Sequence, residues 1–157
     1  MKDNKRNKIF LSELIHINDL NQKNIGFHKS LYPGNSSGII QKYFSIQAYG
    51  LNLNKLGLTD FQFYKCNFSN CSFNNTFMNG INFINCDFTN SDFSNSRISF
   101  SNFENCKLEN SNFYNCDSRM NEFSIKNKRY LVGNLRDSFI RVILYTQFGI
   151  SLKTWGN

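Results

Sequence analysis

The stretch from Cys66 to Phe93 decides the fold, and it reads CNFSNCSFNNTFMNGINFINCDFTNSDF. An apolar residue, usually Phe, returns at every fifth position, and a small or apolar residue stands two places before it. The same spacing continues outward in both directions, from Ile46 to Phe123, without a break in register. Fourteen of the sixteen repeat centres are large and apolar; the centres are Ala48, Leu53, Leu58, Phe63, Phe68, Phe73, Met78, Phe83, Phe88, Phe93, Ile98, Phe103, Leu108, Phe113, Ser118 and Phe123.

A period of five fits neither an α-helix, whose side chains repeat every 3.6 residues, nor a strand, whose side chains alternate. The chain must therefore turn once in each repeat, so that the centre and the residue two before it face one interior. Four sides of five residues close a coil of 20 residues, and stacked coils pair at about 4.8 Å. Centres 20 residues apart then form four columns. The columns that begin at Ala48, Leu53 and Phe63 are apolar throughout, and the one from Leu58 ends at the polar Ser118.

These repeats resemble the pentapeptide-repeat family, whose pattern A(D/N)LXX has Leu or Phe at the centre and a small residue two before it. CNFSN, CDFTN, SDFSN and SNFEN fit that pattern closely. The resemblance implies an all-β solenoid, a right-handed quadrilateral β-helix of about four coils over residues 46–123. Residues 1–45 are then an N-terminal cap segment, and residues 124–157 a C-terminal cap or dimerisation segment. Ser118 and Asn121 depart from the pattern, so the last coil is expected to be loosened.

The corners of the coil have a signature of their own. Asn stands two places after the centre in eight repeats, at positions 70, 75, 85, 90, 95, 105, 110 and 115. Asn tolerates turn conformations, and its amide both donates and accepts hydrogen bonds. Much of the Asn excess, 26 of 157 residues, is therefore interpreted as structural.

Both ends of a coil stack are open sheet edges that need cover. A helix is predicted near Ile9–Leu20, with apolar residues at Ile9, Leu14, Ile17 and Leu20. At the other end, Asn134 is placed to cap a helix that runs to about Phe148. Its apolar stripe is a candidate dimerisation surface: Leu135, Phe139, Val142 and Ile143. The β-branched residues there leave a strand as the alternative.

The five cysteines are interpreted as small buried residues. Cys66, Cys86 and Cys106 share one column, where parallel side chains one coil apart are too far apart at Cβ for a disulfide. No CxxC spacing indicates a metal site, and His16 and His28 lie outside the repeat. No nucleophile, base and orienting group stand together, so we expect no catalytic residues, no cofactor and no metal.

Composition and charge narrow the class of protein further. The 17 Phe residues argue against a disordered chain, and no apolar run is long enough to span a membrane. No signal-peptide core follows the first residues, so a soluble protein is expected, and the unpaired cysteines fit a reducing, cytoplasmic compartment, with a secreted effector left open. The net charge of +7 comes from the two ends, because residues 46–123 total −2. Lys and Arg near the start fit a solvating tail better than a nucleic-acid site.

A few large apolar residues fall at outward positions of the repeat: Tyr64 and Ile84 in one column, Phe100 and Met120 in another, and Phe77. Either a partner protein or a terminal segment of the chain is expected to cover them. We therefore predict a noncatalytic binding or scaffold protein, with a protein partner of unknown identity. The alternative that the resemblance implies is a DNA mimic that protects or inhibits a type II topoisomerase, DNA gyrase. Mimicry needs an acidic stripe, which the spread carboxylates do not form.

Overall fold

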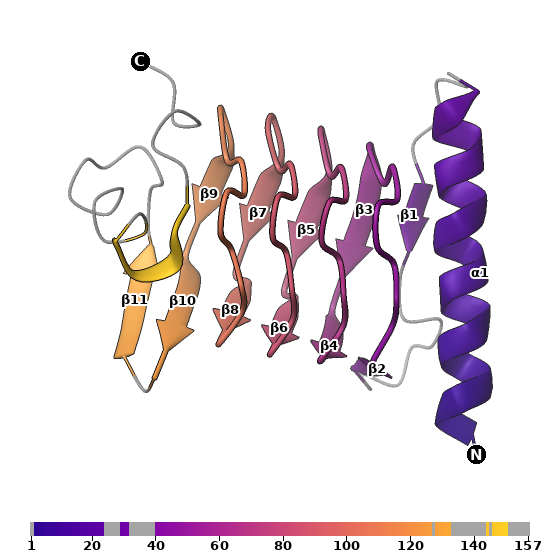
Figure 1. Ribbon diagram of the computed structural model, residues 1–157, viewed down its shortest axis with the longest axis horizontal. Coiled ribbons are helices and arrows are strands. Elements are labelled where there is room, and N and C mark those ends of the chain that lie inside the picture. The colour runs from indigo at the N-terminus through magenta and orange to yellow at the C-terminus, as the bar shows by residue number, and fades with distance from the viewer. Residues whose placement is uncertain are drawn as a thin grey trace.

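The computed structural model describes residues 2–23, 29–31, 40–126, 128–132, 144 and 146–150. One long helix stands across one end of a stack of short strands, and the stack runs from that helix to an antiparallel hairpin at the other end (Figure 1). The elements are α1 (Lys2–Gln22), β1 (Lys29–Leu31), β2 (Gln41–Phe44), β3 (Leu56–Thr59), β4 (Phe61–Tyr64), β5 (Phe77–Asn79), β6 (Asn82–Ile84), β7 (Arg97–Ser99), β8 (Asn102–Glu104), β9 (Asp117–Arg119), β10 (Asn121–Ile125) and β11 (Lys128–Val132).

The strands form two of the four sides of a solenoid of about four turns. Sheet A has the order β1-β3-β5-β7-β9, and sheet B has the order β11-β10-β8-β6-β4-β2. The other two sides are held by single parallel bridges: bridge side 1 through Gln47, Asn67, Asp87 and Lys107, and bridge side 2 through Asn52, Ser72, Asp92 and Asn112. Phe63 lies opposite Phe83, which lies opposite Phe103, which lies opposite Phe123. The predicted coil of 20 residues is confirmed.

The columns of Phe rings fill the interior. Ring centroids are 5.4 Å apart between Phe63 and Phe83, and 4.9 Å between Phe103 and Phe123, with nearly parallel planes. Neighbouring columns meet edge-on, as Phe83 and Phe88 do at 4.8 Å. Offset-stacked and edge-on pairs are the favourable arrangements of aromatic rings. The ring stacking therefore follows the strand spacing, which explains why Phe suits the centre position.

The corner signature has a backbone cause. Every fifth residue from Ser45 to Met120 has a positive φ, and the eight corner Asn residues are among them. This left-handed conformation is costly for most side chains but accessible to Asn and Gly. The interpretation of the Asn excess as structural is confirmed for these eight positions.

The expected loosening of the last coil is wrong. Ser118 lies in β9 and pairs with Ile98, and Asn121 is 1% exposed at the start of β10. The Asn121 amide donates to the Ile98 carbonyl at 2.8 Å and to the Ser118 hydroxyl at 2.6 Å, and its oxygen accepts from the Ser101 amide at 3.0 Å. These bonds satisfy the larger polar side chain, so the coil keeps its register.

The predicted helix near the start is confirmed, and α1 is longer than expected. Phe10, Leu14 and Ile17 are buried on the end of the core, whereas Ile9 is exposed. The Phe10 ring stacks on Tyr43 with centroids 4.1 Å apart. Tyr43 belongs to β2, which pairs with β4 in the same register, so the stacking of coils begins before Ile46.

The other end of the core is covered by three buried apolar residues, Leu144, Phe148 and Ile150. Phe148 lies 5.9 Å from the Phe123 ring and 6.0 Å from Tyr130 of β11. The structure assigns helix at Leu144 and at residues 146–148. The candidate dimerisation residues lie outside the described residues: Leu135, Phe139, Val142 and Ile143.

Candidate partner surface

Three apolar side chains form a short column on the outer face of sheet B. Tyr64 ends β4 and lies opposite Ile84, which ends β6. Phe44 ends β2 on the other side of Tyr64, and the two rings stack with centroids 4.9 Å apart. The Tyr64 hydroxyl donates to the Gln62 side chain at 2.9 Å. The structure thus brings together two predicted residues and adds Phe44, which sequence reasoning missed although Tyr43 and Phe44 already follow the five-residue register.

Phe100 and Met120 share the corner column between sheet A and sheet B, as predicted from their spacing. Phe100 is 63% exposed with φ 50°, and Met120 is 51% exposed with φ 52°. The other members of that column are Asp60 and Gly80. Gly80 has no side chain of its own, and the Asp60 carboxylate takes up that space, because a Cβ on Gly80 would lie 2.5 Å from an Asp60 oxygen. Holding a bulky residue in the left-handed conformation of such a corner costs about 1–2 kcal/mol of folding free energy. An exposed side chain buries little apolar area, so it offsets little of this cost.

Sheet B lies between these two borders, which are apolar in different coils. The column of Phe44, Tyr64 and Ile84 follows its strands, and the corner with Phe100 and Met120 precedes them. Between the borders runs a polar row in which Asn102 donates to the Asn82 side-chain oxygen at 2.9 Å. Four of the five predicted contact residues therefore border one face.

Phe77 does not join them. It is 44% exposed on sheet A, between Gly57 and Arg97 of the neighbouring strands. Along its coil, Phe77 is three positions before the corner residue Gly80. Phe77 is therefore a separate exposed ring beside an exposed Arg.

The charges of the coil are distributed over all four sides. Arg97 and Arg119 flank Asp117 at 3.3 Å and 3.8 Å on sheet A. On bridge side 1, Lys107 lies 4.0 Å from Asp87, and on sheet B, Arg129 lies 3.6 Å from Glu122. Exposed ion pairs of this kind contribute little stability, but each brings a cation close to a carboxylate. The described carboxylates do not form a continuous acidic stripe.

The cysteine column contains free, buried thiols, as predicted. Burial raises the pKa of the Cys71 thiol to about 12, and burial together with nearby Asp117 raises the pKa of Cys116 to about 12. A hydrogen bond with Cys86 and burial raise the pKa of Cys66 as well. The Cys86 and Cys106 thiols donate to the Phe63 and Phe83 carbonyls at 3.4 Å each. The raised pKa values keep Cys66, Cys71 and Cys116 protonated, and protonated thiols are poor nucleophiles and poor metal ligands.

The described residues contain neither a metal-binding cluster nor a membrane-spanning helix. No three or more His, Cys, Asp or Glu side chains in this part of the chain are grouped to hold a metal ion. Among its helices, none has the length and apolar character needed to cross a membrane.

The repeat matches the sequence model of a known family. Residues 53–129 match the family described as a pentapeptide repeat region, over the same coils that the structure stacks. This region of the chain belongs to the pentapeptide-repeat family. The resemblance drawn from CNFSN and its neighbours is thereby confirmed, and with it the solenoid.

Solved structures give more distant likenesses. A pentapeptide repeat protein, Rfr23, from the cyanobacterium Cyanothece 51142 is 13% identical, with a TM-score of 0.40 over 64% of this chain and 80% of that one. A trypsin-treated QnrB1, a plasmid-mediated fluoroquinolone resistance protein, is 14% identical, with a TM-score of 0.24 over 61% of this chain and 65% of that one. No curated protein matched the chain.

Proposed function

We propose that this pentapeptide-repeat protein is a noncatalytic binding module that docks a protein partner on the outer face of sheet B. The observation that carries the proposal is the pair of bulky, exposed side chains at Phe100 and Met120. Their corner positions have a left-handed backbone that favours Asn or Gly, so the fold gains nothing from their size. Aromatic residues and Met are enriched in the buried centres of protein interfaces.

The second apolar border gives such a partner a further contact. Phe44, Tyr64 and Ile84 run along the far side of the same sheet, with the polar row of Asn82 and Asn102 between. A partner that spans sheet B would bury apolar groups at both borders and meet hydrogen-bonding groups in the middle. This is the ordinary composition of a protein–protein interface. Phe77, on sheet A, is the peripheral member of the proposed surface.

The test compares capture by the wild-type chain with capture by a double variant, Phe100→Asn with Met120→Asn. Both proteins are immobilised and exposed to lysate of the organism that encodes the chain, and the bound proteins are quantified by mass spectrometry. We expect a protein that the wild type retains and the double variant loses, at equal folding stability. The matched control is Tyr114→Asn, which removes an exposed ring on bridge side 2 and should leave capture unchanged. Equal recovery by all three proteins would contradict the proposal.

The alternative is a DNA mimic that binds DNA gyrase, and the charges support it less. Its carboxylates would have to follow a continuous line along the rod, whereas Asp87, Asp117 and Glu122 lie on three different sides, each beside a cation. Purified gyrase decides between the two proposals. A concentration-dependent change in supercoiling at micromolar amounts of the protein would favour the mimic, and no change would remove it.

Dimerisation through Leu135, Phe139, Val142 and Ile143 remains a separate proposal, supported by the apolar stripe of the sequence. Sizing by light scattering tests it with Phe139→Asp. We expect a dimer that the variant dissociates. A wild-type monomer, or a dimer in both proteins, would contradict it.

A further inference from the structure

The N-terminal end of the coil stack is covered on three of its four sides. On sheet A, β1 pairs with β3, and on sheet B, β2 pairs with β4. On bridge side 2, α1 supplies side chains in place of a strand: Asn18 accepts from the Asn52 amide at 2.8 Å, and Asn21 donates to the Asn52 and Asn54 carbonyls at 2.9 Å and 3.0 Å. The cap thus supplies a partner wherever it reaches the first coil.

Bridge side 1 is the exception. In every later coil its outward groups are paired: the Asn67 amide donates to the Ile46 carbonyl, the Ala48 amide donates to the Asn67 carbonyl, and the Gly50 amide donates to the Ser69 carbonyl, at 2.8 to 3.0 Å. One coil earlier, the equivalent groups are the amide and carbonyl of Gln47 and the carbonyl of Tyr49. Within the described part of the chain these three groups have no hydrogen-bond partner, and both side chains are exposed.

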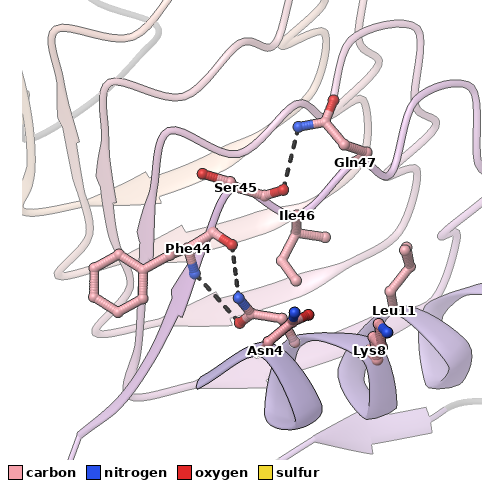
Figure 2. Close-up of a pocket in the computed structure, with 8 residues that line it drawn as sticks. Asn4, Lys8, Leu11, Phe44, Ser45, Ile46 and Gln47 are labelled. Carbon is pink, nitrogen blue, oxygen red and sulfur yellow. Dashed lines mark hydrogen bonds between the residues drawn. The ribbon is translucent and has the colours of Figure 1, made fainter. Parts of the chain in front are cut away.

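A pocket of about 400 Å³ opens beside this edge. Its lining comes from two elements: Asn4, Asn7, Lys8 and Leu11 of α1, and Phe44, Ser45, Ile46 and Gln47 of the first corner. Figure 2 shows Leu11 rising from the helix on the side where Ile46 lies, with Lys8 on the helix beside it. Asn7 fixes the corner, because its amide donates to the Phe44 carbonyl at 2.8 Å. The pocket therefore lies between the helix and the start of bridge side 1, next to the unpaired edge.

We propose that this edge and its pocket bind an extended peptide, which adds a strand to bridge side 1. Unpaired groups at the edge of a sheet are the usual template for strand addition. The hydrogen bonds between neighbouring coils of bridge side 1 show which groups of such a peptide would pair with Gln47 and Tyr49. A peptide parallel to Gln47–Tyr49 would accept from the Gln47 amide with its first carbonyl. Two later amides, at its third and fifth residues, would donate to the Gln47 and Tyr49 carbonyls.

The side chains that such a peptide requires follow from the same stacking. Its first residue lies beside Ile46, where the pocket that Leu11 also lines leaves room for a side chain although Ile46 itself is buried, so an apolar side chain fits there. Its third residue lies above Ala48, which is already 1% exposed, so it must be small. Its second and fourth residues point to solvent. Residues 46–50 of this chain, IQAYG, have this pattern themselves, and a peptide with that sequence is a suitable probe.

The experiment titrates the full chain into a fluorescein-labelled, end-blocked SIQAYGL peptide and follows anisotropy. We expect saturable binding with one peptide per chain. Gln47→Pro should weaken it about fivefold or more, because Pro removes the outward amide, and an edge strand tolerates this. Gln47→Ala is the matched control, since it keeps the amide, and it should bind within about twofold of the wild type.

A second measurement leaves the protein unchanged. Methylation of the amide at the Ala of the peptide removes the donor to the Gln47 carbonyl, and replacement of that Ala by Phe should clash above Ala48. Both peptides should bind at least about fivefold more weakly. The inference is overturned if Gln47→Pro or the methylated peptide binds as tightly as its parent, or if no binding occurs at about 1 mM. It does not rest on the proposed function, because the double variant Phe100→Asn with Met120→Asn should bind the peptide normally.

Discussion

Phe100 and Phe103 are three residues apart and have opposite roles. Phe103 is fully buried in β8, stacked between Phe83 and Phe123 at 5.1 Å and 4.9 Å. Phe100 is 63% exposed at a corner whose backbone disfavours a large side chain. The fold accounts for the first ring and does not account for the second. In this protein the position in the five-residue repeat, and not the residue type, distinguishes structure from a candidate contact.

The largest expected effect is at the interior ring. Phe103→Ala should lower the free energy of unfolding by about 3–5 kcal/mol, because it removes buried area and leaves a cavity between two stacked rings. Phe100→Ala should change it by less than about 0.5 kcal/mol, since an exposed ring has little to lose. Urea unfolding followed by circular dichroism measures both. Comparable losses in the two variants would abolish the distinction.

The next largest effect is the pH dependence of stability that the buried thiols cause. Unfolded thiols ionise with a pKa of 9.0, whereas burial raises the pKa of Cys71 and that of Cys116 to about 12. Between these values the unfolded state binds fewer protons than the folded state, so stability is retained below pH 9 and falls as pH rises toward 12. Each thiol contributes a slope of about 1.4 kcal/mol per pH unit. Between pH 8 and pH 10 the wild type loses unfolding free energy, and Cys71→Ala should make this loss smaller by about 1.4 kcal/mol. An unchanged loss would argue against a buried, protonated thiol.

An ordinary corner residue should show a smaller effect. Asn85 has φ 55°, and its amide donates to the Glu104 carbonyl at 2.8 Å. Asn85→Ala should destabilise the fold by about 1 kcal/mol, because Ala adopts the left-handed conformation less readily. Asn85→Gly keeps that conformation accessible and should cost only a few tenths of a kcal/mol. Thermal and urea unfolding check both, and the reverse order would show that the Asn side chain, rather than the backbone, is what the corner needs.

The five-residue period was enough to predict the columns, the buried thiols and the corners, because one number fixes which residues face inward. The predicted start of the stack at Ile46 is too late, because β2 already pairs with β4. Tyr43 lies five residues before Ala48 and above Phe63, so the register could have been followed further back. The pairing of Lys29 with Leu56 could not have been found, since it departs from the 20-residue spacing.

The hydrogen bonds between α1 and the first coil could not be predicted from the sequence either. Asn7, Asn18 and Asn21 lie on the side of α1 that meets the coil, but an Asn on a helix gives no sign that it will satisfy a strand edge. Asn121 is the matching case inside the coil, where a residue that breaks the pattern is held by three hydrogen bonds. Periodicity predicts where side chains point. It does not predict which polar groups they find there.

The smallest effect is the most informative for the exposed corner. Phe100→Asn replaces a bulky residue at φ 50° with the residue type that most other corners of the repeat use. It removes little buried area, so the free energy of unfolding should rise by about 0.5 kcal/mol or stay unchanged. Urea unfolding beside Phe100→Ala separates the two causes, because Ala shares the loss of the ring but not the tolerance of Asn for the left-handed region. A loss of more than about 1 kcal/mol in Phe100→Asn would mean that the exposed ring stabilises the folded chain, and Phe100 would then belong with Phe103 as a structural residue.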